Sequence, residues 1–274
     1  MTHTTELIPT AAHPAELTEV GTRKLFMEIT GEGTDVVMVH GLGGATSFYD
    51  PIVTELSQQF RFLRYDFNGH GRSPLTGEIS IDSLAQELAE VIRTQTTSGK
   101  AHVIGHSMGT LIVQQLATTH PELVDKIVLL GPVQAQPDKA KAATRQRAAL
   151  VRDQGMSAVA EAISRGATAD QAAEHNPLLR PLVRQLLLTQ NAEAYAQACE
   201  ALAAATNPDL HAITAPVLLI TGDQDAVSTP ETNDAIASEL KNAQRHTISG
   251  IGHWTVLEAP DFVTDYLATF LQDT

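Results

Sequence analysis

The sequence predicts an α/β protein in which a largely parallel sheet carries helices on both faces. Short β-branched runs such as VVMV and VLLIT alternate with longer amphipathic stretches along the 274 residues. This alternation is typical of repeated strand–helix units around a sheet that is buried on both faces. With 43% hydrophobic residues, the chain is long enough to bury a sizeable core. We expect eight strands in one compact unit that carries an insertion.

The predicted elements follow from hydrophobic spacing and from residues that start or stop helices. After a polar tail over 1–13, an opening hairpin is expected over 17–30 with its turn at Gly21. β-Branched runs predict the later strands at 36–39, 62–65, 102–105, 127–130, 217–221 and 245–248. Helices are expected over 47–58, 81–94, 109–120 and 260–271.

The interval from 133 to 213 departs from the repeating pattern. It contains no convincing strand, and its composition turns to alanine, glutamine, arginine and leucine. Leucine and valine recur at helical spacing between Leu178 and Leu187, which favours several short helices packed on the rest of the protein. We therefore expect a helical lid inserted after the sixth strand, with the core formed by 1–132 and 214–274.

The composition argues against several kinds of partner. Nucleic acid and anionic lipid require clustered positive charge, whereas the formal net charge is −14. No apolar run approaches the roughly 18 residues of a membrane span, and residues 1–13 do not resemble a secretory signal. The single cysteine, Cys199, fits a reducing compartment and a buried position. We expect a cytoplasmic protein whose partner is a small molecule.

The strongest local signal is GHSMG at 105–109, between a predicted strand and a predicted helix. It matches the GxSxG turn, in which a strained serine holds its hydroxyl above the sheet. Chance matches occur in glycine-rich loops, but the strand before and the helix after favour the functional interpretation. We predict that Ser107 is a nucleophile. The amide of Met108, at the helix N-terminus, should stabilise the negative charge that develops in acyl transfer.

A second glycine-rich loop, HGLGG at 40–44, directly follows a predicted strand. In this position a backbone amide should converge with that of Met108 on one oxyanion, and the amide of Leu42 is the candidate. A dinucleotide-binding loop is the rival interpretation, but the three glycines do not give the GxGxxG spacing. We interpret His40 as a structural residue that braces the loop.

A serine hydroxyl is a weak nucleophile, so it needs a base and a third group that orients the base. The TGDQD segment after a predicted strand offers Asp225, with Asp223 as the alternative acid. The GIGHW segment places His253 in a loop between the last strand and the last helix. The order serine, acid, histidine agrees with that of enzymes with this serine turn. We interpret His106, inside the turn, as structural.

Five motifs share the order and approximate spacing of one superfamily: HGLGG, RYDFNGHGRSP at 64–74, GHSMG, GDQD and GIGHW. On these motifs the chain resembles the α/β-hydrolase superfamily, and within it the 3-oxoadipate enol-lactonase-like serine hydrolases. The resemblance implies Ser107 as nucleophile, Asp225 as acid and His253 as base. It also implies that the amides of Leu42 and Met108 form the oxyanion hole.

The expected reaction is hydrolysis of a carboxylic ester or lactone of a small organic acid through an acyl-enzyme. This mechanism requires no metal and no organic cofactor. C–C bond hydrolysis and perhydrolysis are alternatives that use the same three residues. A ligand receptor or a cofactor-free oxygenase is an alternative from another class, in which the serine is dispensable.

Three further expectations concern the surroundings of the site. Asn68 stands where the RYDxRGHG version of the motif often has arginine, which puts one loop contact in doubt. Trp254, beside the histidine, is expected in the pocket wall or the core. Arginines of the predicted lid could pair with a substrate carboxylate, but most of them are expected to be solvated; the set includes Arg145, Arg147, Arg152, Arg165, Arg180 and Arg184.

Overall fold

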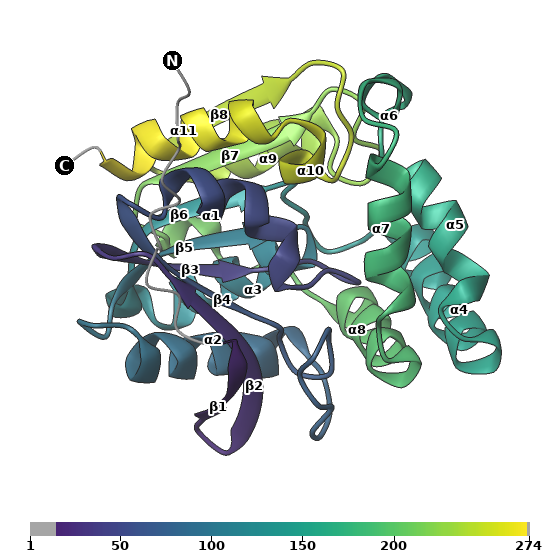
Figure 1. Ribbon diagram of the computed structural model, residues 1–274, viewed down its shortest axis with the longest axis horizontal. Helices are drawn as coiled ribbons and strands as arrows, with labels where there is room; N and C mark the ends of the chain where they lie inside the picture. Colours follow the sequence, from purple (N-terminus) through teal and green to yellow (C-terminus); the bar gives the residue numbers. More distant parts are fainter. Residues whose placement is uncertain (1–14, 273–274) are drawn as a thin grey trace, which may run out of the picture.

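The computed structural model describes residues 15–272 and contains one sheet with the strand order β1-β2-β4-β3-β5-β6-β7-β8 (Figure 1). The hairpin of β1 (Glu16–Val20) and β2 (Arg23–Thr30) turns at Gly21, and β2 pairs antiparallel with β4. The other pairs are parallel and join β3 (Thr34–Val39), β4 (Phe60–Tyr65), β5 (Ala101–His106), β6 (Val124–Leu130), β7 (Val217–Gly222) and β8 (Ala243–Ile248). The predicted eight-stranded, mostly parallel sheet is confirmed. The tail expected over 1–13 lies outside the described residues.

Helices cover both faces because the side chains of each strand alternate between them. On β3, Val37 and Val39 pack on the face covered by α2 (Ile81–Gln95), α3 (Met108–Thr119) and α9 (Pro230–Glu239). The neighbouring Val36 and Met38 pack on the opposite face, which α1 (Asp50–Leu56) and α11 (Pro260–Gln272) cover. The helices predicted over 47–58, 81–94, 109–120 and 260–271 correspond to α1, α2, α3 and α11, so the two helical layers are confirmed.

Five α-helices and one short 3-10 helix, η3 (Leu210–Ala212), lie between β6 and β7. The α-helices are α4 (Asp138–Gln154), α5 (Ser157–Gly166), α6 (Asp170–His175), α7 (Leu179–Leu188) and α8 (Ala192–Ala204). The five α-helices gather beside the sheet, at the right of Figure 1, where α4 packs along α8. The Gln190 side-chain amide donates to the Gly44 carbonyl in the loop after β3, and the His253 N–H donates to the Ala167 carbonyl. The helical insertion therefore lies at the carboxyl ends of the parallel strands. Within residues 15–272, no helix is long and apolar enough to cross a bilayer.

A buried carboxylate on α2 connects the hairpin to the RYDFNGHGRSP loop. Glu87 accepts hydrogen bonds from Arg23 Nη1 at 2.7 Å and from the Asn68 N–H at 3.1 Å. The bond to Glu87 comes from the Asn68 backbone, whereas the Asn68 side-chain oxygen accepts the Thr76 N–H at 2.8 Å, within the loop. The loop therefore keeps its attachment to α2 without an arginine at position 68. Burial raises the pKa of Glu87 to about 7, although Asn68 and Arg23 both act to lower it.

We expect Glu87→Gln to weaken the pH dependence of stability. The folded pKa is above the ordinary value of 4.5, so the folded chain keeps a proton that the unfolded chain releases. The resulting stabilisation is complete below about pH 4.5 and is lost as the pH rises through about 7. Between these limits the free energy of unfolding should fall by roughly 3 kcal/mol more in the wild type than in the variant.

Urea denaturation at a series of pH values measures this difference. Glu90→Gln is the matched control, because the Glu90 side chain is 43% exposed on the same helix. It should leave the pH dependence as in the wild type. An equal pH dependence in both variants would contradict the role assigned to Glu87.

Candidate active site

Ser107 lies in a sharp turn between β5 and α3. Its backbone has φ 52° and ψ −121°, and it is the one non-glycine residue with positive φ among the described residues. Such a conformation costs roughly 1–3 kcal/mol and persists only where packing enforces it. A Cβ on Gly105 would lie 2.6 Å from the Gly109 carbonyl oxygen, and one on Gly109 would lie 2.3 Å from that of Val39. A Cβ on Gly41 would lie 2.8 Å from the Cβ of Ser107, so these segments approach as closely as glycine allows.

Two further loops bring a base and an acid to the serine. Ser107 Oγ lies 2.8 Å from His253 Nε2, and His253 Nδ1 lies 2.8 Å from Asp225 Oδ2. Since a carboxylate only accepts hydrogen bonds, we assign the imidazole proton to Nδ1. Nε2 is then free to accept the proton of the serine hydroxyl. The three predicted side chains thus form one hydrogen-bonded chain, with contributions from the loops after β5, β7 and β8.

The two candidate acids have different surroundings. Asp225 is buried, and its Oδ1 accepts two backbone N–H groups of the following loop at 2.7 Å each. Burial acts to raise the pKa of Asp225, but His253 and these donors hold it below its ordinary value, which keeps the carboxylate ionised. Asp223 is exposed and accepts instead from Ser249 Oγ at 2.8 Å and from the Gly250 N–H at 2.7 Å. Asp223 therefore stabilises the turn after β8, and Asp225 contacts the histidine.

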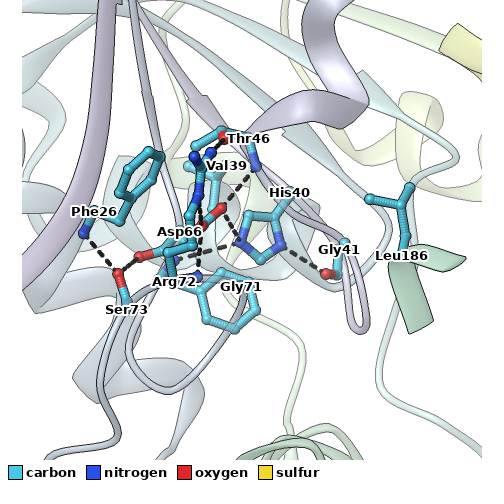
Figure 2. A network of polar contacts seen from close by, with 12 residues as sticks. Phe26, Val39, His40, Gly41, Thr46, Asp66, Gly71, Arg72, Ser73 and Leu186 are labelled. Atoms are coloured by element: carbon cyan, nitrogen blue, oxygen red, sulfur yellow. Dashed lines mark hydrogen bonds and ion pairs between the residues drawn. The ribbon is translucent and has the colours of Figure 1, made fainter. Parts of the chain in front are cut away.

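A buried carboxylate and a neutral imidazole brace the loop after β3. Figure 2 shows the Asp66 carboxylate accepting the N–H of Thr46 at 2.7 Å and that of Arg72 at 2.9 Å. Beside it, His40 Nδ1 donates to the Gly41 carbonyl at 2.9 Å. Burial lowers the pKa of His40, so its ring stays neutral. His40 thus supports the glycine-rich loop, in agreement with its structural interpretation.

Two backbone amides beside the serine have no acceptor among the described protein residues. Within residues 15–272, neither the N–H of Leu42 nor that of Met108 donates to another protein group. Met108 begins α3, and the first N–H groups of a helix have no partner within it. Leu42 lies in a tight turn, which the N–H of Gly44 closes by donating to the Gly41 carbonyl at 3.0 Å. Both amides are therefore available to an oxygen atom bound at Ser107.

A cavity of about 480 Å³ opens at Ser107 and His253. Its size is typical of small-molecule sites, and apolar side chains from the loop after β6 and from the helical insertion form much of its wall. Trp254 is buried and lines this cavity. His106 also lines it and donates through Nε2 to the His253 carbonyl at 2.8 Å. Burial, with a smaller effect of His253, lowers the pKa of His106 to about 3, so this histidine is neutral.

One arginine of the helical insertion faces the cavity. Arg147 of α4 is part of its wall, whereas Arg145 on the same helix is exposed. The other four arginines pair with carboxylates of the insertion itself: Arg152, Arg165, Arg180 and Arg184. Most of the lid arginines therefore lie at the surface, as expected, and Arg147 is the one of the six that lines the cavity. Cys199 is buried, as predicted, and contacts Arg147.

Two side chains that no sequence motif indicates connect the helical insertion to the loops around Ser107 and His253. Gln190, between α7 and α8, donates to the Gly44 carbonyl at 3.1 Å and accepts the Gly71 N–H at 3.0 Å. Glu258 of α10 (Thr255–Glu258) accepts the Ala169 N–H at 2.9 Å and an N–H of the histidine loop at 2.7 Å. The insertion thereby fixes both the loop after β3 and the loop that carries the histidine.

The fold and this arrangement define a class of protein. The chain belongs to the alpha/beta hydrolase fold family, whose sequence pattern matches residues 35–260. The match spans the HGLGG loop, the RYDFNGHGRSP loop, the serine turn, the helical insertion and the histidine loop.

Individual relatives narrow the class. The chain is 31% identical over 227 residues to 3-oxoadipate enol-lactonase 2 of Acinetobacter baylyi, covering 82% of this chain and 84% of the relative. It is 28% identical over 251 residues to (E)-2-((N-methylformamido)methylene)succinate hydrolase of the same organism, covering 89% and 92%. A malate-bound thermophilic esterase from Thermogutta terrifontis has a TM-score of 0.87 at 26% identity, covering 91% of this chain and 93% of that one. Fold and relatives together identify the chain as a hydrolase.

We expect Gln190→Ala to lower the stability of the fold. The substitution leaves the Gly71 N–H and the Gly44 carbonyl without their partner, which costs roughly 1–3 kcal/mol. Gln185→Ala, on the exposed side of α7, is the matched control and should cost less than about 0.5 kcal/mol. Urea denaturation of both variants measures the difference. Equal unfolding midpoints would show that the Gln190 contacts contribute nothing.

Proposed function

We propose that this chain is a serine hydrolase that cleaves a carboxylic ester or lactone of a small organic acid. The hydrogen-bonded chain of Ser107, His253 and Asp225 at the cavity is the observation that carries the proposal. A relative named as an enol-lactonase and a structural neighbour named as an esterase support the same type of bond cleavage.

In the first half of the proposed reaction, Ser107 Oγ attacks the substrate carbonyl carbon while His253 Nε2 takes its proton. Asp225 holds the Nδ1 proton and stabilises the imidazolium that forms. The amides of Leu42 and Met108 donate to the oxyanion of the tetrahedral intermediate. The intermediate then expels the alcohol oxygen, which receives the proton from Nε2. An acyl-enzyme remains, and in a lactone the new hydroxyl stays attached to the acyl group.

In the second half, His253 Nε2 takes a proton from water as the water oxygen attacks the acyl carbon. The second tetrahedral intermediate expels Ser107 Oγ, which recovers its proton from the imidazolium. The free acid leaves the cavity. Every proton moves through side chains of this protein, so the proposed cycle contains no step that needs a metal or an organic cofactor.

We also propose that residues 133–213 act as a lid over the cavity. Side chains of α4, α5 and α8 line the cavity, which supports this role. Trp254, next to the histidine, is proposed to contact the substrate from the side of the core. The acidic composition supports a small-molecule partner, and the single cysteine supports a cytoplasmic location.

Ser107 is expected to react with a fluorophosphonate probe, because such probes modify activated serine hydroxyls. Peptide mass spectrometry should locate the adduct on Ser107, and the wild type should hydrolyse p-nitrophenyl acetate and butyrate. Ser107→Ala and His253→Ala should each lower turnover by about a thousandfold or more. Ser238→Ala, at the exposed surface of α9, is the control and should leave both readouts unchanged.

The same assays separate the alternatives. A folded protein with neither labelling nor ester turnover would favour a receptor or a serine-independent enzyme. Turnover of vinylogous diketones in place of esters would indicate a C–C bond hydrolase.

Asp225→Asn is expected to lower kcat by roughly a thousandfold or more. An amide in place of the carboxylate favours the wrong imidazole tautomer and does not stabilise the imidazolium. Asp223→Asn is the matched control and should keep activity within about tenfold, because Asp223 contacts the turn after β8. Steady-state kinetics with p-nitrophenyl butyrate compares the two. A larger loss in Asp223→Asn would assign the acid to Asp223.

A further inference from the structure

His106, the last residue of β5, donates a hydrogen bond to the residue that carries the base. Its Nε2 lies 2.8 Å from the main-chain carbonyl oxygen of His253. Because a carbonyl oxygen only accepts hydrogen bonds, we assign the imidazole proton of His106 to Nε2. Burial lowers the pKa of this imidazole to about 3, so the ring is neutral and Nε2–H is its one donor. The contact therefore persists throughout the neutral pH range.

Two consecutive residues of the serine turn contact His253 at two different points. Ser107 Oγ lies 2.8 Å from the imidazole Nε2 of His253, and the preceding residue, His106, binds the main-chain carbonyl. The Ser107 N–H donates to the Leu130 carbonyl of β6 at 2.9 Å, which fixes this turn to the sheet. Both points of contact thus belong to one rigid segment. Together they restrict the distance of the base from the serine and also its rotation.

The amide side of the histidine loop is held by other elements. The His253 N–H donates to the Ala167 carbonyl of the helical insertion at 2.9 Å. Glu258 accepts the N–H of Gly252 at 2.7 Å and that of Trp254 at 2.9 Å. These contacts do not involve the carbonyl of His253, which accepts from His106. Loss of the His106 donor would leave a buried carbonyl without this partner and would release the loop on the side of the serine turn.

Packing alone does not account for a histidine at this position. The His106 ring packs on the Phe48 ring, with centroids 4.3 Å apart, and its centroid lies 5.7 Å from that of Trp254. A phenyl ring would fill this space without the cost of burying two ring nitrogens. The low pKa of His106 reflects that cost, because burial is its main cause. The donor at Nε2 is the property that a phenyl ring lacks.

We infer that His106 is a positioning residue that holds His253 against Ser107 through the main-chain carbonyl of the base. The inference rests on the proposed serine hydrolysis, in which His253 Nε2 faces the serine hydroxyl. His106 transfers no proton to the substrate and acts through His253. Because a displacement of about 1 Å can cost roughly a hundredfold in rate, loss of this contact should lower kcat more than it changes KM.

Three substitutions separate the hydrogen bond from the packing. His106→Phe keeps an aromatic ring against Phe48 but removes the donor. His106→Gln removes the ring but places an amide nitrogen as many bonds from Cα as Nε2 of histidine. His106→Met has a similar length to the glutamine and no donor, so it provides the same comparison if the phenylalanine variant does not fold.

Steady-state kinetics with p-nitrophenyl butyrate compares the three variants. In His106→Phe and His106→Met, kcat should fall by about tenfold to a hundredfold while KM stays within about threefold of the wild type. His106→Gln should recover kcat to within about threefold of the wild type, because it restores the donor. Retained activity in His106→Phe with a loss in His106→Gln would show that the ring matters for packing, and it overturns the inference. Equal losses in His106→Gln and His106→Met overturn it as well.

His102→Phe is the matched control, because it makes the same substitution at a buried position near the other end of β5. It should keep kcat and KM as in the wild type. Urea denaturation of all the variants identifies any that are unstable under the assay conditions. A fall in kcat in the control as large as that in His106→Phe would assign the effect to a general disturbance of β5 and would refute the positioning role.

The proton between His253 Nδ1 and Asp225 provides a measurement that does not depend on turnover. When the histidine is held in place, this proton exchanges slowly with water and resonates downfield of the backbone amides in a proton NMR spectrum. The wild type and His106→Gln should show this resonance, and His106→Phe should broaden or lose it. An unchanged resonance with unchanged kcat in His106→Phe overturns the role of His106 and leaves serine hydrolysis standing. A resonance that depends on His106, without ester turnover by the wild type, supports the positioning role and overturns the proposed function alone.

Discussion

The strained backbone of Ser107 is the constraint on which the rest of the site depends. At this turn β3, β5 and α3 approach so closely that only glycine fits at positions 41, 105 and 109. The approach of β3 places the HGLGG loop beside the serine, and the start of α3 supplies amides without partners inside the helix. The close packing of β3, β5 and α3 therefore imposes the strained backbone of Ser107 and also places the amides of Leu42 and Met108 beside its hydroxyl.

The other two loops reach the serine under restraints of their own. Asp225 is fixed by backbone N–H groups of its own loop, and the histidine loop is fixed by Glu258. These contacts exist independently of the hydrogen bonds between Asp225, His253 and Ser107. The orientation of the three side chains is consequently fixed by contacts outside their own hydrogen-bonded chain, which is the preorganisation that the proposed reaction requires.

Local patterns explain why much of the fold and the core of the site could be predicted from the sequence. The sheet follows from β-branched runs, and Ser107 lies in a five-residue motif between a strand and a helix. Asp225 and Asp223 differ in the sequence only by their distance from the strand end. Their burial and their partners separate them.

The remaining contacts could not be read from the sequence because they join distant segments. Gln190 and Gly71, like Glu258 and Ala169, meet only when the helical insertion packs on the core. The sequence does not distinguish Arg147 from the other five lid arginines, because α4 has few buried residues that would mark its inward face. The tertiary packing of that helix, rather than its composition, directs Arg147 inward and Arg145 outward.

The helical insertion contacts the core in two separate ways. α4 contributes Thr144 and Arg147 to the cavity wall, whereas Gln190 and the segment after α5 attach to the catalytic loops. Because Gln190 and the segment after α5 lie outside α4, substitutions on the inward face of α4 change the cavity wall and leave these attachments in place. A mutant library confined to that face would vary the shape and polarity of the cavity while the loops that carry Ser107 and His253 keep their contacts with the insertion.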